Sequence, residues 1–356
     1  MDTSSANSTP VPNSLSEIDK MRVQLQSANL PANLHEKALQ QIDRINLTLK
    51  YGGSFAQLDI TAKYIDWITH IPWDISSPDT LDIIKAKEFL DKNHFGLDKV
   101  KNMILEYLSV LIMQKKTANT TVYHATNLFF VGLAGTGKTT FAKSIAEALG
   151  RKLVRIPFGG LSSALDLRGQ SKTSPEAEPG MIMRALRQAG TKNPVILLDE
   201  LDRCTPESRS SIMGVLIELL DPGQNSSYTD YFIDYPFDLS QALFVSTANN
   251  TTTIATAVLD RLEVVQMPSY NDLEKKEIGK RFVFPKYVKE AGLTPEQLKI
   301  EDTTWDKLVR PLGFEPGIRS LERQIELIVR KTAYKIVSGQ AASVVINDEN
   351  LREFVA

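Results

Sequence analysis

The sequence has very little cysteine and no long apolar run. Cys204 is the single cysteine among 356 residues, so no internal disulfide is possible. This excludes a disulfide-stabilised secreted scaffold and fits a reducing compartment. No apolar run approaches the ~20 residues that a membrane-spanning helix needs. Residues 1–14 lack the apolar core of a secretory signal and the arginines of a mitochondrial presequence. These absences predict a cytoplasmic protein without a membrane partner.

The chain also lacks an excess of charge of either sign. It carries 41 lysines and arginines against 43 aspartates and glutamates, a formal net charge of −2. With this balance, and without a basic run or a helix-turn-helix pattern, a nucleic-acid partner is not indicated. The 42% of hydrophobic and 24% of charged residues are typical of globular proteins and exclude a mostly disordered chain.

The apolar pattern changes three times along the chain. The first residues are rich in Ser, Thr, Asn and Pro and predict a disordered tail. Apolar residues then recur at three- and four-residue spacing, which predicts a small helical unit. After the stretch DISSPD, helices around 81–93 and 97–115 lead into a part where helices alternate with strands, and the pattern after Pro268 is mostly helical again. We therefore predict four parts, namely 1–14, 15–75, 76–268 and 269–356.

Four short apolar runs in the third part are typical of β-strands. Each is almost continuously apolar, and helical patterns separate them. This favours an α/β fold with a parallel sheet that helices cover on both faces. The predicted strands are 128–131, 153–156, 195–198 and 242–247.

The strongest motif follows the first predicted strand. GLAGTGKT, residues 132–139, fits the pattern GxxxxGK[ST] and opens the helical run TFAKSIAEAL, which is the context that a P-loop requires. Its glycines let backbone N–H groups curl around phosphate oxygens at the positive end of a helix dipole. Lys138 supplies a charge for the β- and γ-phosphates, and Thr139 offers a hydroxyl to Mg²⁺. The alternative is a glycine-rich turn without a ligand. The predicted ATP-binding residues of this loop are Gly132, Leu133, Ala134, Gly135, Thr136, Gly137, Lys138, Thr139 and Thr140.

Two carboxylates end the third predicted strand, in the sequence VILLDE. A buried strand that ends in Asp199 and Glu200 places both at the carboxyl edge of the sheet, where a doubly wound fold binds ligands. Asp199 would hold the water shell of Mg²⁺ together with Thr139, and Glu200 would polarise the attacking water. A solvated acidic strand end is the alternative.

Further strings extend the motif and point to one family. These strings are LLDELD, AGTKNPVILLDE, LLDPGQNSSYTDYFIDYPFDLS, STANN, LDRLEV and GIRSLER. Together they resemble the AAA+ module of Lon-type ATP-dependent proteases. AKYIDWITHIPW and NHFGLDKVKNMILEYLSV are similar to the helical segments that precede this module. The resemblance covers about residues 16–355. It implies a P-loop AAA+ parallel-sheet core, a helical N-terminal segment and a C-terminal, mostly helical lid domain.

The resemblance implies roles for four further positions. Asn249 resembles the sensor-1 residue that orients the lytic water, and Arg319 resembles the sensor-2 arginine that the lid brings over the γ-phosphate. Arg261 resembles the arginine finger that acts in the neighbouring subunit's site; its alternative is a surface pair with Glu263. The stretch from Phe95 to Leu97 resembles the segment that borders the adenine. With Glu200, we expect Asn249, Arg261 and Arg319 to be the catalytic residues.

The family also implies partners, and here the sequence departs from its pattern. Lon-type modules form hexameric rings that act on protein clients. The first client-gripping loop corresponds to residues 169–180, but its aromatic–aliphatic pair is replaced by Ser174 and Pro175, and the second loop reads ESRSSIMG over 207–214. No GxSxG, HExxH or Cys–His arrangement is present, and the histidines are expected to pack or face solvent. These are His35, His70, His94 and His124.

Three functions remain open at this point. The first is an AAA+ ATPase that forms a ring and remodels or recruits a protein partner without cleaving peptides. The second is the ATPase half of a split or truncated Lon-type serine endopeptidase. The third is an ATP-binding protein that co-assembles with a full-length relative and changes its activity. Intact ATPase motifs favour turnover over static binding. ATP and Mg²⁺ are the cofactors in all three.

Overall fold

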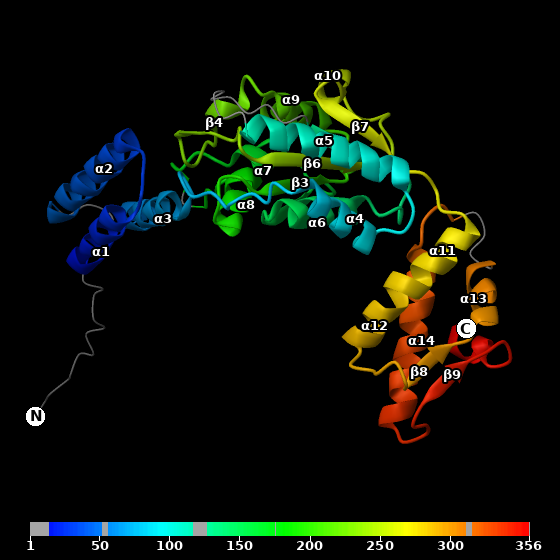
Figure 1. Cartoon of the computed structure of the whole chain (residues 1–356). Helices are drawn as coiled ribbons and strands as arrows, with labels where there is room; N and C mark the ends of the chain where they lie inside the picture. The colour runs from blue at the N-terminus through cyan, green and yellow to red at the C-terminus, as the bar shows by residue number, and fades with distance from the viewer. Residues whose placement is uncertain (1–13, 52–55, 117–126, 175, 311–314, 356) are drawn as a thin grey trace, which may run out of the picture.

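Figure 1 shows the computed structural model of the chain, which describes residues 14–51, 56–116, 127–174, 176–310 and 315–355. A helical unit near the N-terminus is followed by a central α/β part and then by a mostly helical C-terminal part. The α/β class with helical flanks is therefore confirmed. Residues 1–13 of the predicted tail lie outside the described residues, and so does Pro175.

Three helices form the N-terminal unit, as the spacing of apolar residues predicts. Each helix buries one stripe, so Leu25, Ile42 and Ile65 are fully buried. The third helix also contacts the central part, where the Tyr64 hydroxyl donates to the carbonyl oxygen of Ile233 at 3.3 Å. The bounds are α1 (Ser14–Ser27), α2 (Ala32–Lys50) and α3 (Ala56–His70).

The central part is built on a five-stranded sheet with the order β2-β3-β6-β1-β7, in which every neighbouring pair is parallel. The four predicted strands are confirmed to within one residue at each end. β7 was missed because its run LEVVQ contains the half-buried Glu263 and the exposed Gln266. The strands are β1 (Asn127–Val131), β2 (Leu153–Pro157), β3 (Val195–Asp199), β6 (Leu243–Ala248) and β7 (Leu262–Gln266).

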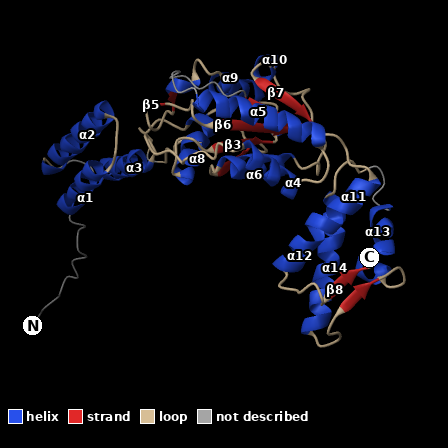
Figure 2. Ribbon diagram, viewed as in Figure 1, coloured by secondary structure: helices blue, strands red, loops and turns tan. Residues whose placement is uncertain are grey.

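Helices cover both faces of this sheet (Figure 2). Successive side chains of a strand point to opposite faces, so Phe129 packs in the apolar cluster that holds α8 and α9, and Phe130 packs in the cluster that holds α4, α5 and α6. Both rings are fully buried. These helices are α4 (Ile83–Asn93), α5 (Asp98–Lys116), α6 (Lys138–Leu149), α8 (Met181–Ala189) and α9 (Arg209–Leu220).

The expected second client loop at 207–214 is mostly helical instead. α9 begins at Arg209, because Ile212, Met213 and Leu216 bury an apolar face at helical spacing. Only the first two residues of the predicted loop precede the helix. The smaller elements of the central part are α7 (Leu165–Arg168), η1 (Leu201–Arg203), η2 (Asn225–Ser227), β4 (Tyr228–Thr229), β5 (Pro236–Phe237) and α10 (Thr256–Leu259).

The C-terminal part packs its helices beside a two-stranded parallel sheet. Its first helix contains a π turn at Gly279, where a Cβ atom would lie 2.8 Å from the ring of Trp305. Such turns occur often at functional sites. None of the helices in the described ranges is long and apolar enough to cross a membrane. The elements are α11 (Asp272–Ile278), η3 (Gly279–Val283), α12 (Phe284–Glu290), β8 (Leu298–Ile300), α13 (Asp302–Val309), α14 (Arg319–Val337), β9 (Val344–Ile346) and α15 (Leu351–Val355).

The stretch DISSPD between α3 and α4 is tied to the central part. The amide oxygen of Asn193 accepts a hydrogen bond from the backbone of Ser77 at 2.9 Å. The Asp79 side chain is 4% exposed and accepts two hydrogen bonds from the Arg151 guanidinium, at 2.7 and 2.9 Å, while Lys115 forms an ion pair with it. Since a buried carboxylate is stable only when paired, Asp79 anchors this connection.

We expect Asp79→Ala to lower the free energy of unfolding by about 3 kcal/mol, because it leaves the buried Arg151 guanidinium without its carboxylate. Asp74→Ala is the matched control: its carboxylate is 71% exposed and lies 3.5 Å from Lys192, so its loss should cost about 0.5 kcal/mol or less. Urea unfolding followed by circular dichroism measures both. Equal effects of the two substitutions would contradict the anchoring role.

Candidate functional site

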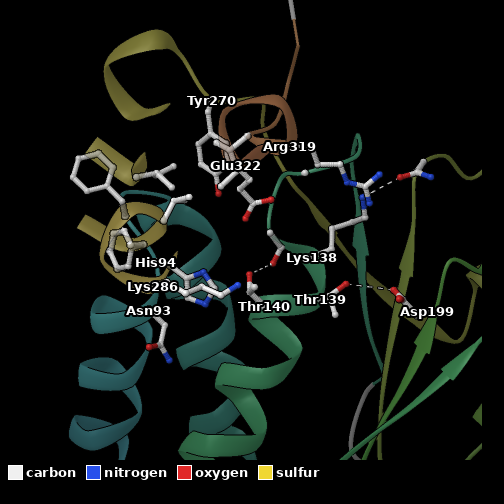
Figure 3. A pocket seen from close by; sticks show the side chains of 18 of the residues that line it. Asn93, His94, Lys138, Thr139, Thr140, Asp199, Tyr270, Lys286, Arg319 and Glu322 are labelled. Carbon is white, nitrogen blue, oxygen red and sulfur yellow. Dashed lines mark hydrogen bonds between the residues drawn. The ribbon is translucent and has the colours of Figure 1, made fainter. Parts of the chain in front are cut away.

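A cavity of about 480 Å³ lies where the carboxyl edge of the sheet meets the C-terminal part, and Figure 3 shows its lining. Pockets of this size typically hold small ligands or cofactors. Nine of the residues predicted to bind ATP or Mg²⁺ or to act in catalysis line it: Gly135, Gly137, Lys138, Thr139, Thr140, Asp199, Glu200, Asn249 and Arg319.

The loop between β1 and α6 has the backbone of a phosphate cradle. Gly135 and Gly137 have φ angles of 80° and 91°, which L-residues with a side chain rarely adopt. A Cβ atom at Gly135 would also lie 3.1 Å from the backbone nitrogen of Ile318. Gly137 precedes α6 without any side-chain cap, so the first N–H groups of this helix remain available to an anion.

Lys138 is the first residue of α6, and its ammonium group points into this loop. It donates to the carbonyl oxygens of Gly132 at 2.5 Å and Leu133 at 2.9 Å, and to Oδ1 of Asn249 at 3.1 Å. Burial lowers the pKa of Lys138, and the nearby Arg319 lowers it further, while carboxylates such as Asp202 oppose these effects. None of its hydrogen-bond acceptors carries a full charge, so an anion in the cavity would be a stronger partner.

Arg319 begins α14 and brings a second cation to the same place. Figure 3 shows its guanidinium close to the end of the Lys138 side chain. The guanidinium has no hydrogen-bond or ion-pair partner in the described parts of the chain. Two neighbouring cations repel each other until an anion lies between them. The pair therefore fits a phosphate group.

Asp199 ends β3 and is 5% exposed. Its Oδ1 atom accepts a hydrogen bond from the Thr247 hydroxyl at 2.5 Å and lies 3.5 Å from the Thr139 hydroxyl. Its Oδ2 atom accepts from Nε of Arg155 at 2.7 Å. The hydroxyl of Thr139 and the carboxylate of Asp199 are thus neighbouring hard oxygen donors, the kind of ligand that Mg²⁺ prefers.

Glu200 follows Asp199 and adopts a left-handed backbone conformation with φ 60°. Its backbone N–H donates to the Thr247 hydroxyl at 2.9 Å, so the same threonine fixes both Asp199 and Glu200. For a residue with a side chain this conformation costs roughly 1–2 kcal/mol, and Glu200 lines the cavity. Asn249 directly follows β6 and reaches the cavity from the adjacent strand.

The other end of the cavity is more apolar and lies between α4 and the C-terminal part. His94, Phe95, Tyr270 and Phe282 line it, so Phe95 lies at the cavity, and its expected place beside adenine stays a prediction. The His94 ring stacks on Phe141 with 3.7 Å between centroids, and its Nε2 atom is hydrogen-bonded to the Ser144 hydroxyl at 3.0 Å. Burial lowers the pKa of His94 to about 4, helped by the charge of Lys101, so the ring is neutral at pH 7.

Arg261 lies elsewhere, next to the start of β7 and hence at the amino edge of the sheet. It does not line the cavity of its own chain. Its guanidinium pairs with Asp221, which accepts from its Nη2 atom at 2.8 Å and from Nε at 3.1 Å. The pairing with Glu263 considered from the sequence is replaced by this contact. Hydrogen bonds from Arg261 lower the pKa of Asp221, so this carboxylate is ionised at neutral pH.

Sequence reasoning missed several residues of the cavity. Arg155 is a charge inside the apolar strand LVRIP, and that interruption was the available signal. His94 was expected to pack or face solvent; its ring stacks on Phe141, and it also lines the cavity. Tyr270, Lys286 and Glu322 come from the C-terminal part, and no local pattern marks them. Conversely, four residues of the predicted set form the loop backbone without lining the cavity: Gly132, Leu133, Ala134 and Thr136.

Two family models match the chain. The model described as "ATPase family associated with various cellular activities (AAA)" matches residues 128–270, and the "Lon protease AAA+ ATPase lid domain" matches residues 289–345. The first match covers the sheet and its loops. The second covers most of the C-terminal part.

Similar proteins carry the name Lon protease. The chain is 40% identical over 331 residues to the Lon protease of Desulforamulus reducens, 38% over 345 residues to Lon protease 2 of Thermus thermophilus, and 38% over 339 residues to Lon protease 1 of Bacillus subtilis. These alignments cover 93%, 95% and 95% of this chain and 40%, 42% and 43% of the relatives. The chain thus spans about two fifths of the length of the curated relatives that it matches.

The lowered pKa of His94 predicts that acid destabilises the fold through this residue. In the unfolded chain His94 has a pKa of about 6.5, whereas in the folded protein its pKa is about 4. Between these pH values the unfolded chain binds a proton that the folded protein does not bind. The free energy of unfolding therefore falls as the pH drops below about 6.5. The loss between pH 7.5 and pH 5 should be about 2 kcal/mol. In His94→Gln this component should be absent, and urea unfolding at both pH values measures the difference. Equal pH dependence in both proteins would contradict it.

Proposed function

The chain carries an AAA+ ATPase region of the Lon type, and from this premise we propose that it binds and hydrolyses Mg-ATP in a ring assembly. The nucleotide cycle would remodel or recruit a protein partner. One observation carries the proposal. Lys138, Arg319 and Asn249 line the same cavity as Asp199 and Glu200, and Lys138 is hydrogen-bonded to Asn249 at 3.1 Å, so cations, carboxylates and an amide converge on space for a triphosphate.

The charges of the cavity support the assignment of each role. Lys138 and Arg319 bind the phosphate oxygens, and the N–H groups at the start of α6 complete the anion site. Thr139 and Asp199 hold Mg²⁺, which when bound neutralises charge on the β- and γ-phosphates. Glu200 accepts a proton from the attacking water, which Asn249 orients.

The position of Arg261 supports a ring. The guanidinium lies at the amino edge of the sheet, while the cavity lies at the carboxyl edge, so Arg261 cannot serve its own site without a large rearrangement. The Arg261 of one subunit could instead reach the cavity of its neighbour. The planar guanidinium holds its N–H donors in a fixed geometry that matches the oxygens of a phosphoryl group. We propose that Arg261 completes the site of the adjacent subunit in a hexamer.

The loop at 169–180 supports recruitment or remodelling over ordinary threading. Ser174 is exposed between α7 and α8, and its hydroxymethyl group offers little apolar area to a passing polypeptide. An aromatic side chain would bury roughly 150–250 Å². Lys63 of α3 donates to the carbonyl oxygen of Ala177 at 2.8 Å, so this loop is also held from the N-terminal helices.

A second candidate is the ATPase part of a Lon-type endopeptidase, with the peptidase in the same longer protein or in another chain. The relatives of D. reducens, T. thermophilus and B. subtilis are named Lon protease, and this chain spans about two fifths of their length. The same ATPase chemistry would then drive proteolysis. Casein degradation in the presence of a co-purifying peptidase would favour this candidate.

Glu200→Gln should lower the ATPase rate by about 10²-fold or more, because the amide cannot accept the proton of the attacking water. Nucleotide binding should persist, since Lys138 and Arg319 are unchanged. A coupled phosphate-release assay measures hydrolysis, and fluorescence of mant-ATP measures binding. Glu207→Gln, at an exposed position outside the cavity, is the control and should keep the wild-type rate.

Mixing two inactive variants tests whether Arg261 acts on a neighbour. Glu200→Gln subunits keep the finger and Arg261→Ala subunits keep the water-activating carboxylate, so each should be inactive alone. In a one-to-one mixture about a quarter of the sites have both groups, and activity should recover to that extent. Arg330→Ala, an exposed arginine on α14, should stay active alone. Absence of recovery in rings of confirmed mixed composition would contradict action in trans.

A further inference from the structure

Arg155 is a charged residue on an edge strand that otherwise packs apolar side chains. It lies in β2, and its side chain is 55% exposed, yet its Nε atom reaches Oδ2 of Asp199 at 2.7 Å. It lines the same cavity as Lys138 and Thr139. Arg155 has no part in the proposed roles of the ATPase residues.

Asp199 needs a cation whenever the cavity holds no metal ion. Its side chain is 6% exposed, and a buried carboxylate without a counter-ion is strongly unfavourable. Arg155 is its one ion-pair partner within the described ranges. The remaining contacts come from uncharged hydroxyl groups, those of Thr247 at 2.5 Å and Thr139 at 3.5 Å.

The same carboxylate is the one that the proposed site offers to Mg²⁺. A guanidinium close to a divalent cation is repelled by it, so the two cations cannot both be stabilised fully by Asp199. The Asp199 side chain is fixed by Thr247, whereas Arg155 extends from an edge strand with more than half of its side chain in water. Arg155 is therefore the group that can move away at low cost.

We propose that Arg155 is a replaceable counter-ion of Asp199, which neutralises this carboxylate in the nucleotide-free protein and competes with Mg²⁺ for it. Arg155 is in this sense a positioning residue: it holds Asp199 ready and sets the magnesium concentration at which the site fills. The inference rests on the proposed Mg-ATP site. A permanent structural pair is the competing explanation, and it predicts no change in magnesium dependence when the pair is removed.

Arg155→Gln tests the competition, because glutamine keeps a donor and a similar stem but removes the charge. The magnesium concentration for half-maximal mant-ATP binding should fall about two- to fivefold, the range expected for loss of a half-exposed ion pair. Without nucleotide and magnesium the variant should melt at a lower temperature than wild type, and with Mg-ATP this difference should shrink. Binding of mant-ATP in EDTA should be the same in both proteins.

Two further variants separate the pair from general charge effects. Arg155→Lys keeps the positive charge and should stay close to wild type in magnesium dependence. Lys152→Gln removes an exposed charge just before the same strand, outside the cavity, and should also match wild type.

The outcomes distinguish this inference from the proposed function. If wild type binds no mant-ATP at any magnesium concentration, the nucleotide site itself is wrong. If wild type binds and Arg155→Gln has an unchanged or higher magnesium requirement, the site stands and the counter-ion role is overturned. A lower melting temperature without a change in magnesium dependence would leave a structural pair only and would overturn it as well.

Discussion

All five strands of the central sheet run parallel, and this constraint places the functional side chains at one edge. Parallel strands are joined by crossovers, so their carboxyl ends meet on the same side and their loops surround one space. The loop after β1, the carboxylates after β3 and the amide after β6 reach the cavity from three adjacent strands. Their spacing is therefore set by the backbone hydrogen bonds of the sheet. Thr247 adds a second constraint, because it binds both Asp199 and the backbone of Glu200.

The C-terminal part completes the cavity through close backbone contact with the phosphate loop. A Cβ atom at Gly317 would lie 2.3 Å from the carbonyl oxygen of Ala134, so the two segments of the backbone touch where only glycine fits. The N–H of Ile318 donates to the Gly135 carbonyl oxygen at 3.3 Å, and the Tyr270 hydroxyl donates to that of Thr136 at 3.1 Å. A phosphate that shifts this loop would thus also shift the residues that position Arg319, because the two segments are in direct contact.

Much of this arrangement could be predicted from local sequence. Short-range patterns of apolar residues and glycines predict the four strands, the phosphate loop and the long helices, because these patterns determine the local backbone conformation. β7 and the helical start of α9 were missed because tertiary burial, at Val265 and Ile212, decided their structure against a mixed local pattern. Arg155 could not be predicted as a partner of Asp199, since the contact joins residues 44 positions apart. The position of Arg261 relative to the cavity likewise depends on the fold alone.

Contacts within the protein stabilise charged side chains of the cavity. Two of these charged side chains have internal partners: Lys138 binds loop carbonyl oxygens and Asn249, and Asp199 binds Arg155. Arg261 is held by Asp221 in the same way at the opposite edge of the sheet. In the proposed ATPase ring, exchanging these partners for phosphates, a metal ion or a neighbouring subunit would cost less than creating bare buried charges. On this proposal, binding replaces contacts that are already present instead of ordering free groups. Arg319 differs, because it has no such partner in the described residues, and so its guanidinium gains most when an anion enters.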